Sequence, residues 1–228
     1  MRVAIHQPNY LPWCGYFAKI AAADCFIVLD DVPMPTGRSY LSRASILGSA
    51  GSQWLTVPIA RRGSTRIADV AMAQDRWPAR HIRTLRACYG HRAYGDRILS
   101  LLAPQYADPG ERLADFNLRL LQTLLALLGI TTPVVRASAL SVPGHGSAHL
   151  LGLVQAVGGS EYLSGPSGRS YLDESLFTQF GIPIRYGCYE SIEYAQGSHP
   201  FVPALSVVDA LCHVGPDAAR ALLSYRHN

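Results

Sequence analysis

Residues 2–17 read RVAIHQPNYLPWCGYF, and this stretch decides the fold class of the chain. The apolar run Val3–Ile5 predicts a short buried strand, and the loop that follows it is polar and stiffened by Pro8 and Pro12. In open α/β sheets, ligands bind just beyond the carboxyl ends of the strands. The polar side chains directly after this strand are therefore the first candidates for a functional site: His6, Gln7, Asn9 and Tyr10.

A helix and a second strand are predicted next. Residues 15–23 carry apolar side chains at helical spacing, and Cys25–Leu29 is a second apolar run that closes on Asp30 and Asp31. Strand, helix and strand in this order form a βαβ unit with parallel strands and a right-handed crossover. We therefore expect an α/β fold with a largely parallel, Rossmann-like sheet.

The rest of the chain continues the alternation of strands and helices. Further strands are predicted at 53–59, 67–72, 133–139, 161–164 and 182–189. Helices are predicted at 77–88, 98–102, 113–128, 147–157, 170–180 and 206–213, followed by a helical tail from residue 216, whereas 38–47 fits either a strand or a helix. We expect one domain over residues 1–228, in which a helical subdomain, roughly 77–128, is inserted between two halves of the sheet.

Composition excludes several classes of protein. The 228 residues are 49% hydrophobic, which suits one large domain or two small ones with a shared core. The chain contains no run of eighteen apolar residues, and the apolar run near its start is too short for a signal peptide, so we expect a cytoplasmic protein without a membrane span. The cysteines lack paired spacing, which favours reduced thiols: Cys14, Cys25, Cys88, Cys188 and Cys212.

The net charge of +4 comes almost entirely from arginine, since Lys19 is the one lysine. Guanidinium groups suit phosphate and carboxylate, and the charge is too modest and dispersed for duplex nucleic acid, so an anionic or nucleotide-linked small molecule is the expected partner. An arginine-biased genome explains the composition equally well. The basic loop at 61–66 is interpreted as a solvated surface.

Five segments carry a resemblance to a known family: HQPNYLPWCGYF at 6–17, DCFIVLDDV at 24–32, QWLTVPI at 53–59, YLSGPSGRSYL at 162–172 and FVPALSVVDAL at 201–211. Together they resemble the WbqC-like family, whose members occur in bacterial O-antigen and other biosynthetic gene clusters. The resemblance implies work on sugars, amino sugars or other small building blocks. Residues 40–46 depart from the family pattern W-x-N-R-N-x-I, of which Arg43 and Ile46 are kept.

The opening also looks like that of the HUP-type nucleotidyltransferases, and this similarity supports a HUP-like sheet. Those enzymes carry H-x-G-H at the start of the first helix, where this chain has Trp13-Cys14-Gly15-Tyr16. Gly15 matches and both histidines are missing, so the similarity does not establish adenylyl transfer. No cofactor motif is evident, and a nucleotide or nucleotide-linked donor remains open.

Two candidate catalytic positions follow from the strand ends. His6 is a candidate general base, because histidine titrates near neutral pH, and the alternative is an imidazole satisfied by backbone groups. Asp30 is a candidate for orienting a hydroxyl or amine, with Asp31 beside it as a substrate-binding residue. Neighbouring side chains on a strand face opposite ways, so one of the two aspartates is expected in the site, and the alternative is turn chemistry.

The remaining candidates would bind substrate. Gln7 and Asn9 are interpreted as hydrogen-bonding groups, and Tyr10 and Trp13 as rings that stack on a ligand or cover the core. Arg43 is a candidate for an anion, and the helical His81 is either a ligand contact or structural. The turn after residue 163 places glycines before a predicted helix, a pattern that favours an anion, although an ordinary turn is the alternative: Ser164, Gly165, Ser167, Gly168 and Arg169.

Other chemistries lack their signatures. No H-E-x-x-H or paired cysteines indicate a metal site, no G-x-S-x-G indicates a hydrolase, and Cys14 is assigned to packing. Two hypotheses remain. The first is a group-transfer enzyme (acyl, aminoacyl or nucleotidyl transfer, or ligation) that acts on an amino sugar or small metabolite. The second is a non-catalytic protein that binds a metabolite or a partner enzyme.

Overall fold

The computed structural model describes residues 1–60, 65–197 and 200–227. A six-stranded sheet lies at its centre in the order β5-β2-β1-β6-β7-β8, and the strands are parallel except for β8, which is antiparallel to β7. The α/β, largely parallel and Rossmann-like architecture is therefore confirmed. The strands are β1 (Arg2–His6), β2 (Cys25–Val28), β5 (Val134–Arg136), β6 (Glu161–Ser164), β7 (Ile184–Tyr189) and β8 (Tyr225–His227).

The first strand lies in the middle of the sheet. Ala4 pairs with Phe26 of β2 on one side and with Leu163 of β6 on the other. Side chains alternate between the two faces, so Ala4 belongs to one hydrophobic core while Val3 and Ile5 belong to the other. A strand covered on both faces needs apolar side chains at every position, which is why residues 3–5 form an uninterrupted apolar run.

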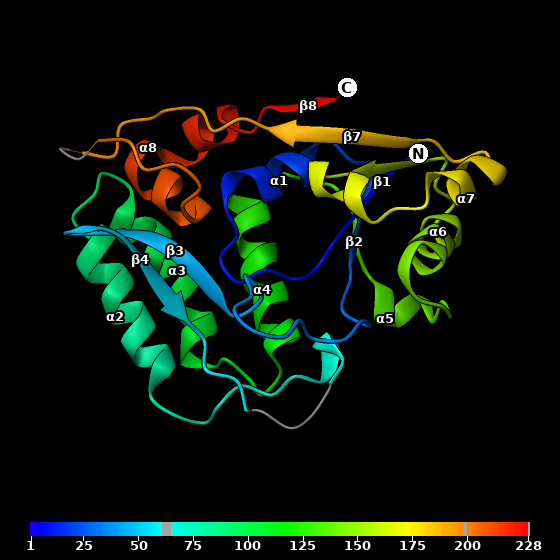
Figure 1. The fold of residues 1–228 in the computed structure, drawn as a ribbon. Coiled ribbons are helices and arrows are strands. Elements are labelled where there is room, and N and C mark those ends of the chain that lie inside the picture. The colour runs from blue at the N-terminus through cyan, green and yellow to red at the C-terminus, as the bar shows by residue number, and fades with distance from the viewer. Residues whose placement is uncertain (61–64, 198–199, 228) are drawn as a thin grey trace.

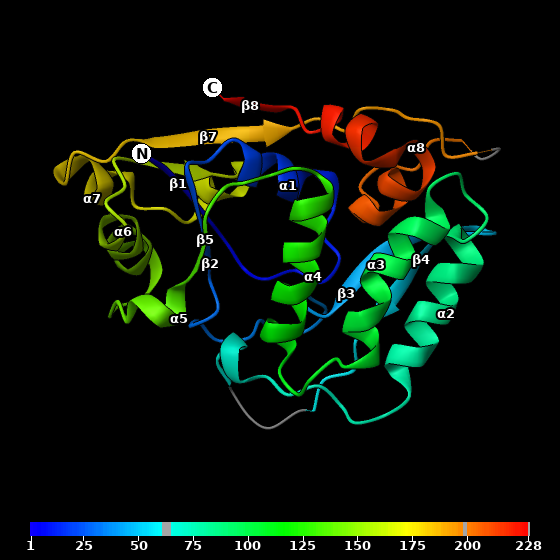
Figure 2. The same ribbon diagram turned by 180° about the vertical axis from the view of Figure 1, so that it is seen from behind.

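Helices supply both cores (Figures 1 and 2). One core contains residues of α1 (Cys14–Ala21), α4 (Leu113–Leu127) and α8 (Val207–Ala221), and the other contains residues of α5 (Ala137–Leu140), α6 (Gly146–Ala156) and α7 (Glu174–Gln179). The end of the molecule away from α5–α7 holds α2 (Trp77–Tyr89), α3 (Gly95–Ala107) and the hairpin of β3 (Arg43–Gly48) and β4 (Gly51–Thr56). The helices predicted within 77–128 are thus α2, α3 and α4.

Two predicted strands are wrong or too long. Residues 67–72 form the short 3₁₀ helix η1 (Ile67–Asp69) and loop, because the backbone there bonds to scattered partners, such as the amide of Met72 to the carbonyl of Glu111. The strand at 133–139 stops at Arg136. The carboxylate of Asp30 accepts hydrogen bonds from the backbone and side chain of Ser138, and these begin the helix α5 instead.

Several other boundaries differ from the prediction. The helix expected at 170–180 is confined to α7, which Asp173 caps, after the 3₁₀ helix η2 (Pro166–Ser170). The ambiguous segment 38–47 contributes β3, and the strand expected at 53–59 ends at Thr56. Part of the basic loop, residues 61–64, lies outside the described residues.

The carboxyl-terminal segment contains the expected helix and helical tail, and also a strand that was not predicted. Its helix continues across a kink at Gly215, whose φ of 82° favours glycine, and ends at Ala221. The chain then adds β8 to the edge of the sheet, where Cys188 pairs with Arg226. Within the described ranges, none of the helices is long and apolar enough to cross a membrane.

Candidate functional site

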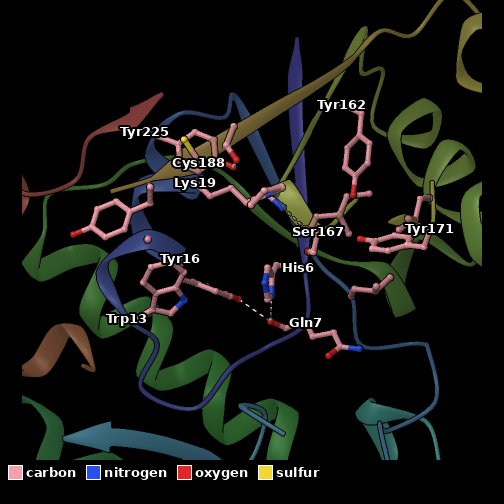
Figure 3. A pocket seen from close by; sticks show the side chains of 18 residues that line it. His6, Gln7, Trp13, Tyr16, Lys19, Tyr162, Ser167, Tyr171, Cys188 and Tyr225 are labelled. Atoms are coloured by element: carbon pink, nitrogen blue, oxygen red, sulfur yellow. Dashed lines mark hydrogen bonds between the residues drawn. The ribbon is translucent and has the colours of Figure 1, made fainter. Parts of the chain in front are cut away.

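The sheet has a switch point between β1 and β6. From β1 the chain proceeds to β2 and β5 on one side, and it then crosses to β6 and β7 on the other. A crevice opens at the carboxyl ends of the strands at such a point, which is where ligands bind in folds of this type. The structure has a cavity of about 590 Å³ there, called the switch-point cavity below (Figure 3).

Residues from distant parts of the chain line this cavity. The predicted candidates among them are His6, Gln7, Trp13, Gly15, Gly165 and Ser167. Sequence reasoning missed several others: Tyr16, Lys19, Tyr162, Tyr171, Cys188, Tyr189 and Tyr225. The opening loop and the turn after β6 therefore meet at one rim of the sheet.

His6 ends β1 with its imidazole in the cavity (Figure 3). Its Nδ1 lies 3.1 Å from the backbone carbonyl of Gln7, which also accepts a hydrogen bond of 3.0 Å from the hydroxyl of Tyr16. A carbonyl can only accept, so Nδ1 carries the hydrogen and Nε2 keeps its lone pair. Burial, reinforced by the charge of Lys19, lowers the pKa of His6 to about 4. The imidazole is therefore neutral at pH 7.

Lys19 is the one basic residue among those that sequence reasoning missed. It lies on α1 and is 7% exposed, and its Nζ donates a hydrogen bond of 2.9 Å to the carbonyl of Ile5. Burial lowers the pKa of this amine to about 8. One sequence signal was available, because this is the one lysine in a chain with many arginines.

The turn after β6 contributes backbone and one hydroxyl to the rim. Gly165 and Ser167 line the cavity. Gly168 packs so closely that a Cβ there would lie 2.1 Å from Oγ of Ser164, so the turn requires a glycine. Arg169 stacks on the ring of Tyr186, at 4.1 Å from its centroid, and does not line the cavity.

Tyr10 and His81 lie elsewhere, in a buried aromatic cluster against the helices. The hydroxyl of Tyr10 is 2.9 Å from Nδ1 of His81 and 2.6 Å from the hydroxyl of Tyr106. Burial lowers the pKa of His81 to about 4. Asn9 is also buried, and neither it nor the cluster lines the switch-point cavity. Tyr10 therefore covers the core and His81 is structural, as the alternative interpretations of both residues proposed.

Asp30 is fully buried outside the switch-point cavity. Its carboxylate accepts hydrogen bonds of 2.6 Å from Nε of Arg136 and of 2.9 Å from both the amide and the hydroxyl of Ser138. Arg136 continues to Asp115 at 2.6 Å. The carboxylate thus joins β2 to β5 and α5, and its acceptor capacity is engaged within the protein.

Asp31 and Arg43 have separate surroundings. Asp31 pairs with Nε2 of His149 at 3.1 Å and borders a second cavity of about 510 Å³ beside the 141–146 loop. The guanidinium of Arg43 lies over the ring of Trp54, 4.2 Å from its centroid, on the hairpin. The expectation that the two adjacent aspartates diverge is met, but neither lines the switch-point cavity.

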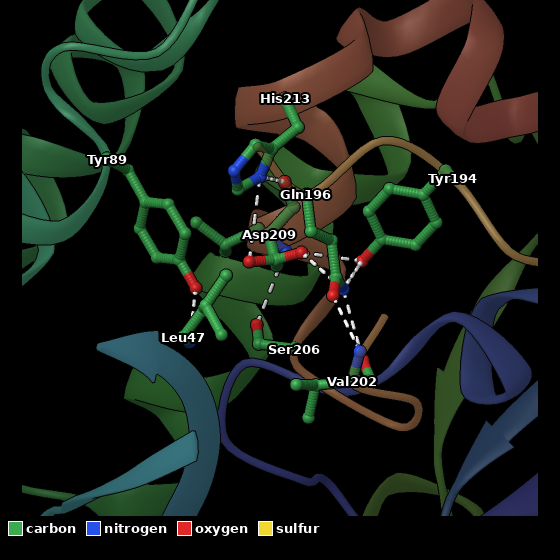
Figure 4. A network of polar contacts seen from close by, with 9 residues as sticks. Leu47, Tyr89, Tyr194, Gln196, Val202, Ser206, Asp209 and His213 are labelled. Carbon is green, nitrogen blue, oxygen red and sulfur yellow. Dashed lines mark hydrogen bonds and ion pairs between the residues drawn. The ribbon is translucent and has the colours of Figure 1, made fainter. Parts of the chain in front are cut away.

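A buried polar network surrounds Asp209 in α8 (Figure 4). Its carboxylate accepts hydrogen bonds of 2.7 Å from the hydroxyl of Tyr194 and of 3.0 Å from Nε2 of Gln196. The imidazole of His213 packs against Tyr89, whose hydroxyl accepts a hydrogen bond from the amide of Leu47 in β3. The network therefore ties α8 to Tyr194 and Gln196, and Gln196 in turn to Val202, and it borders the contacts between α2 and the hairpin.

Cys14, at the start of α1, is buried, and burial raises the pKa of its thiol to about 12. The thiol is therefore protonated at neutral pH, and packing accounts for this residue. Across the described parts of the chain, no group of three or more histidine, cysteine or acidic side chains is placed to hold a metal ion.

Comparison with known proteins gives a family and one relative. A family model described as "WbqC-like protein family" matches residues 7–221. The chain is similar to the "Uncharacterized protein Rv1507c" of Mycobacterium tuberculosis (strain ATCC 25618 / H37Rv), with 36% identity over 221 residues that cover 95% of each chain. No solved structure matches the chain significantly.

Proposed function

The chain belongs to the WbqC-like protein family, and from this membership and the geometry of the switch-point cavity we propose that it is a group-transfer enzyme. Its substrate would be an amino sugar or a related small metabolite, used in the cytoplasm for polysaccharide or secondary-metabolite biosynthesis. The transferred group would be acyl, aminoacyl or nucleotidyl.

One observation carries the proposal: a neutral imidazole with a fixed tautomer stands at the switch point of the sheet. The Nδ1–H of His6 is held by the carbonyl of Gln7, which leaves the Nε2 lone pair available. A hydroxyl or amine of the acceptor would give its proton to Nε2 while its oxygen or nitrogen attacks the electrophilic atom of the donor. The same proton would then pass from His6 to the leaving group.

The walls of the cavity suit the body of a small ring-containing molecule. Trp13, Tyr16, Tyr162 and Tyr171 present aromatic surface, while the side chains of Gln7 and Ser167 provide hydrogen-bonding groups. Binding sites for small molecules are commonly of this kind, largely apolar with a few polar groups, and of roughly 300–1,000 Å³. The cavity, at about 590 Å³, falls within this range.

A second function, binding without catalysis, is favoured by one specific observation. The pKa of His6, lowered to about 4, makes its imidazole a weak base in the free protein. The segment Trp13-Cys14-Gly15-Tyr16 at the start of α1 also lacks the two histidines of the nucleotidyltransferases that it resembles. An accessory protein that binds a metabolite would need neither.

The test is a thermal-shift screen of nucleotides, nucleotide sugars, acyl-CoAs and amino acids, followed by turnover assays of the compounds that raise the melting temperature. If the protein is an enzyme, His6→Gln lowers kcat by about 10²–10⁴-fold and retains ligand binding. The matched control is His91→Gln, which alters an exposed histidine and leaves both unchanged. Binding without turnover by the native chain, across all donor and acceptor pairs, would instead support the accessory function.

A further inference from the structure

Lys19 has no negatively charged partner in the switch-point cavity. Within the described residues it forms no ion pair, and neither aspartate nor glutamate lines the cavity. Its one hydrogen bond there goes to the carbonyl of Ile5, whereas an ammonium group has three N–H donors. A buried cation of this kind lacks both its counter-charge and part of its hydrogen bonding, which destabilises the folded chain.

We propose that Lys19 is the counter-charge for an oxyanion of the ligand, a phosphate or carboxylate group, bound in the switch-point cavity. The inference deepens the proposed function and rests on its premise that this cavity binds the substrate. It names one property of that substrate, a negative charge, and it places this charge at the amine of Lys19.

The presence of lysine rather than arginine at position 19 favours a charge that depends on pH and on the bound ligand. Lys19 is the one lysine of the chain, whereas arginine, a permanent cation, is common in it. Guanidinium stays protonated at all pH values that proteins meet, whereas a buried ammonium can lose its proton. With a pKa lowered to about 8 by burial, Lys19 exchanges its proton near neutral pH, and a bound oxyanion would favour the protonated form.

The oxyanion would also act on His6. The charge of Lys19 is one of the causes that lower the pKa of His6, and a negative group between them would offset that charge. The imidazole would become a stronger base only when a ligand of the correct charge is bound. In Figure 3 the side chain of Lys19 extends toward His6. Burial raises the pKa of every tyrosine that lines the cavity, so these hydroxyls are neutral at pH 7 and add no charge: Tyr16, Tyr162, Tyr171, Tyr189 and Tyr225.

A single lysine makes the experiment direct. Protein prepared with lysine labelled with ¹³C at Cε and ¹⁵N at Nζ gives one side-chain lysine signal by NMR, and its pH titration reports the protonation of Lys19. The titration is repeated with phenyl phosphate, benzoate and the neutral benzyl alcohol, whose similar rings separate charge from apolar contact. We expect the midpoint to rise by about one pH unit with an oxyanion and to stay in place with the alcohol.

Variants give an independent readout by thermal shift and calorimetry with the same three compounds. We expect Lys19→Met to weaken binding of the preferred oxyanion at least tenfold and to leave benzyl alcohol unaffected. Arg185→Met removes an exposed cation that pairs with Glu161, and it serves as the control with unchanged binding. Phenyl phosphate and benzoate distinguish a phosphate ligand from a carboxylate.

The outcomes separate this inference from the proposed function. The counter-charge would be overturned if neither anion shifted the titration midpoint of Lys19, or if Lys19→Met bound both anions as tightly as the native chain. Either result would stand even if His6→Gln abolished turnover. Conversely, anion binding that depends on Lys19 in a protein without turnover would uphold the inference and contradict the enzymatic function. If Lys19→Met does not fold, the NMR titration of the native chain decides alone.

Discussion

At the scale of residues, burial separates two kinds of polar side chain. Asp30 and Tyr10 are buried and hydrogen-bonded to partners within the protein. His6 and Lys19 line a cavity and keep unused hydrogen-bonding groups there. The sequence could not distinguish these cases, because a polar residue after a strand looks the same whether its partner is a ligand or a distant arginine such as Arg136. The position of His6 at the cavity, by contrast, was predictable from the strand that precedes it.

The first prediction concerns Asp30. Replacing it with alanine leaves Arg136 and Ser138 without their shared acceptor, so Asp30→Ala should lower the free energy of unfolding by about 3 kcal/mol, as breaking a buried pair does. Urea unfolding measures the change. Asp24→Ala removes an exposed ion pair with Arg2 and should cost about 1 kcal/mol or less. Equal losses for the two variants would contradict the assignment of Asp30 to the core.

The second prediction concerns stability at acidic pH. The pKa of His6 is about 4 in the folded chain, below its ordinary value of 6.5, so between these values the unfolded chain binds a proton that the folded chain does not. The free energy of unfolding should therefore fall as the pH drops from 6.5 to 4, and His81 contributes in the same direction. In His6→Gln the decline should be shallower. Identical pH profiles would contradict a buried, neutral imidazole.

The third prediction concerns Lys19. Its folded pKa of about 8 lies below the ordinary value of 10.5, so the buried charge opposes folding below pH 8, and this penalty fades as the pH rises from 8 to 10.5. Lys19→Met should therefore raise the free energy of unfolding at pH 7 by about 1–3 kcal/mol, with a smaller gain at pH 10. Urea unfolding at both pH values measures this. A variant less stable than the native chain at pH 7 would show that the amine supports the fold.

At the scale of elements, local sequence patterns predicted a strand or helix correctly where its side chains are buried in the core along its length. The run at 25–29 and the alternation of strand and helix around it predicted β2 and its parallel pairing with β1 correctly. Patterns failed where a distant group sets a boundary, as Asp30 does when it binds Ser138 at the end of β5. The start of α7, by contrast, is set by a local cap, Asp173, which sequence reasoning overlooked. The edge strand β8 spans three residues, which is too few for any periodicity.

The fourth prediction concerns the turn at η2. A Cβ on Gly168 would lie 2.1 Å from Oγ of Ser164 and 2.9 Å from Leu172, so Gly168→Ala should displace the turn and weaken ligand binding at least tenfold. Gly165 has open space at the corresponding position, and Gly165→Ala should keep the native melting temperature. Thermal shift with the ligand found in the screen measures both. Unimpaired binding by Gly168→Ala would show that the turn does not shape the site.

At the scale of the whole molecule, the Asp209 network joins segments that the sequence gives no reason to connect. Motif FVPALSVVDAL at 201–211 was recognisable as a family feature, but its role depended on Tyr194 and Gln196 upstream. Long-range pairing of this kind has no local pattern, so only the folded chain reveals it. The same holds for the aromatic walls of the switch-point cavity.

The fifth prediction concerns that network. Asp209→Ala removes the acceptor of the Tyr194 hydroxyl and one of the acceptors of Gln196 Nε2, which also donates to the carbonyl of Val202, and it should lower the free energy of unfolding by about 2–3 kcal/mol. The backbone around Gln196 and Val202 should then exchange its amide hydrogens faster than the strands of the sheet. Tyr194→Phe removes one hydroxyl and should cost only about 1 kcal/mol. Unchanged exchange in Asp209→Ala would show that other contacts hold this backbone.

The edge strand β8 has a consequence for how the protein matures. His6 stands near the start of the chain and Tyr225 near residue 228, yet both border the same cavity. During synthesis the cavity stays open until β8 has left the ribosome and docked beside β7. A tightly bound metabolite would then hold that strand in place, so slower cleavage of β8 by endoproteases would report an occupied pocket.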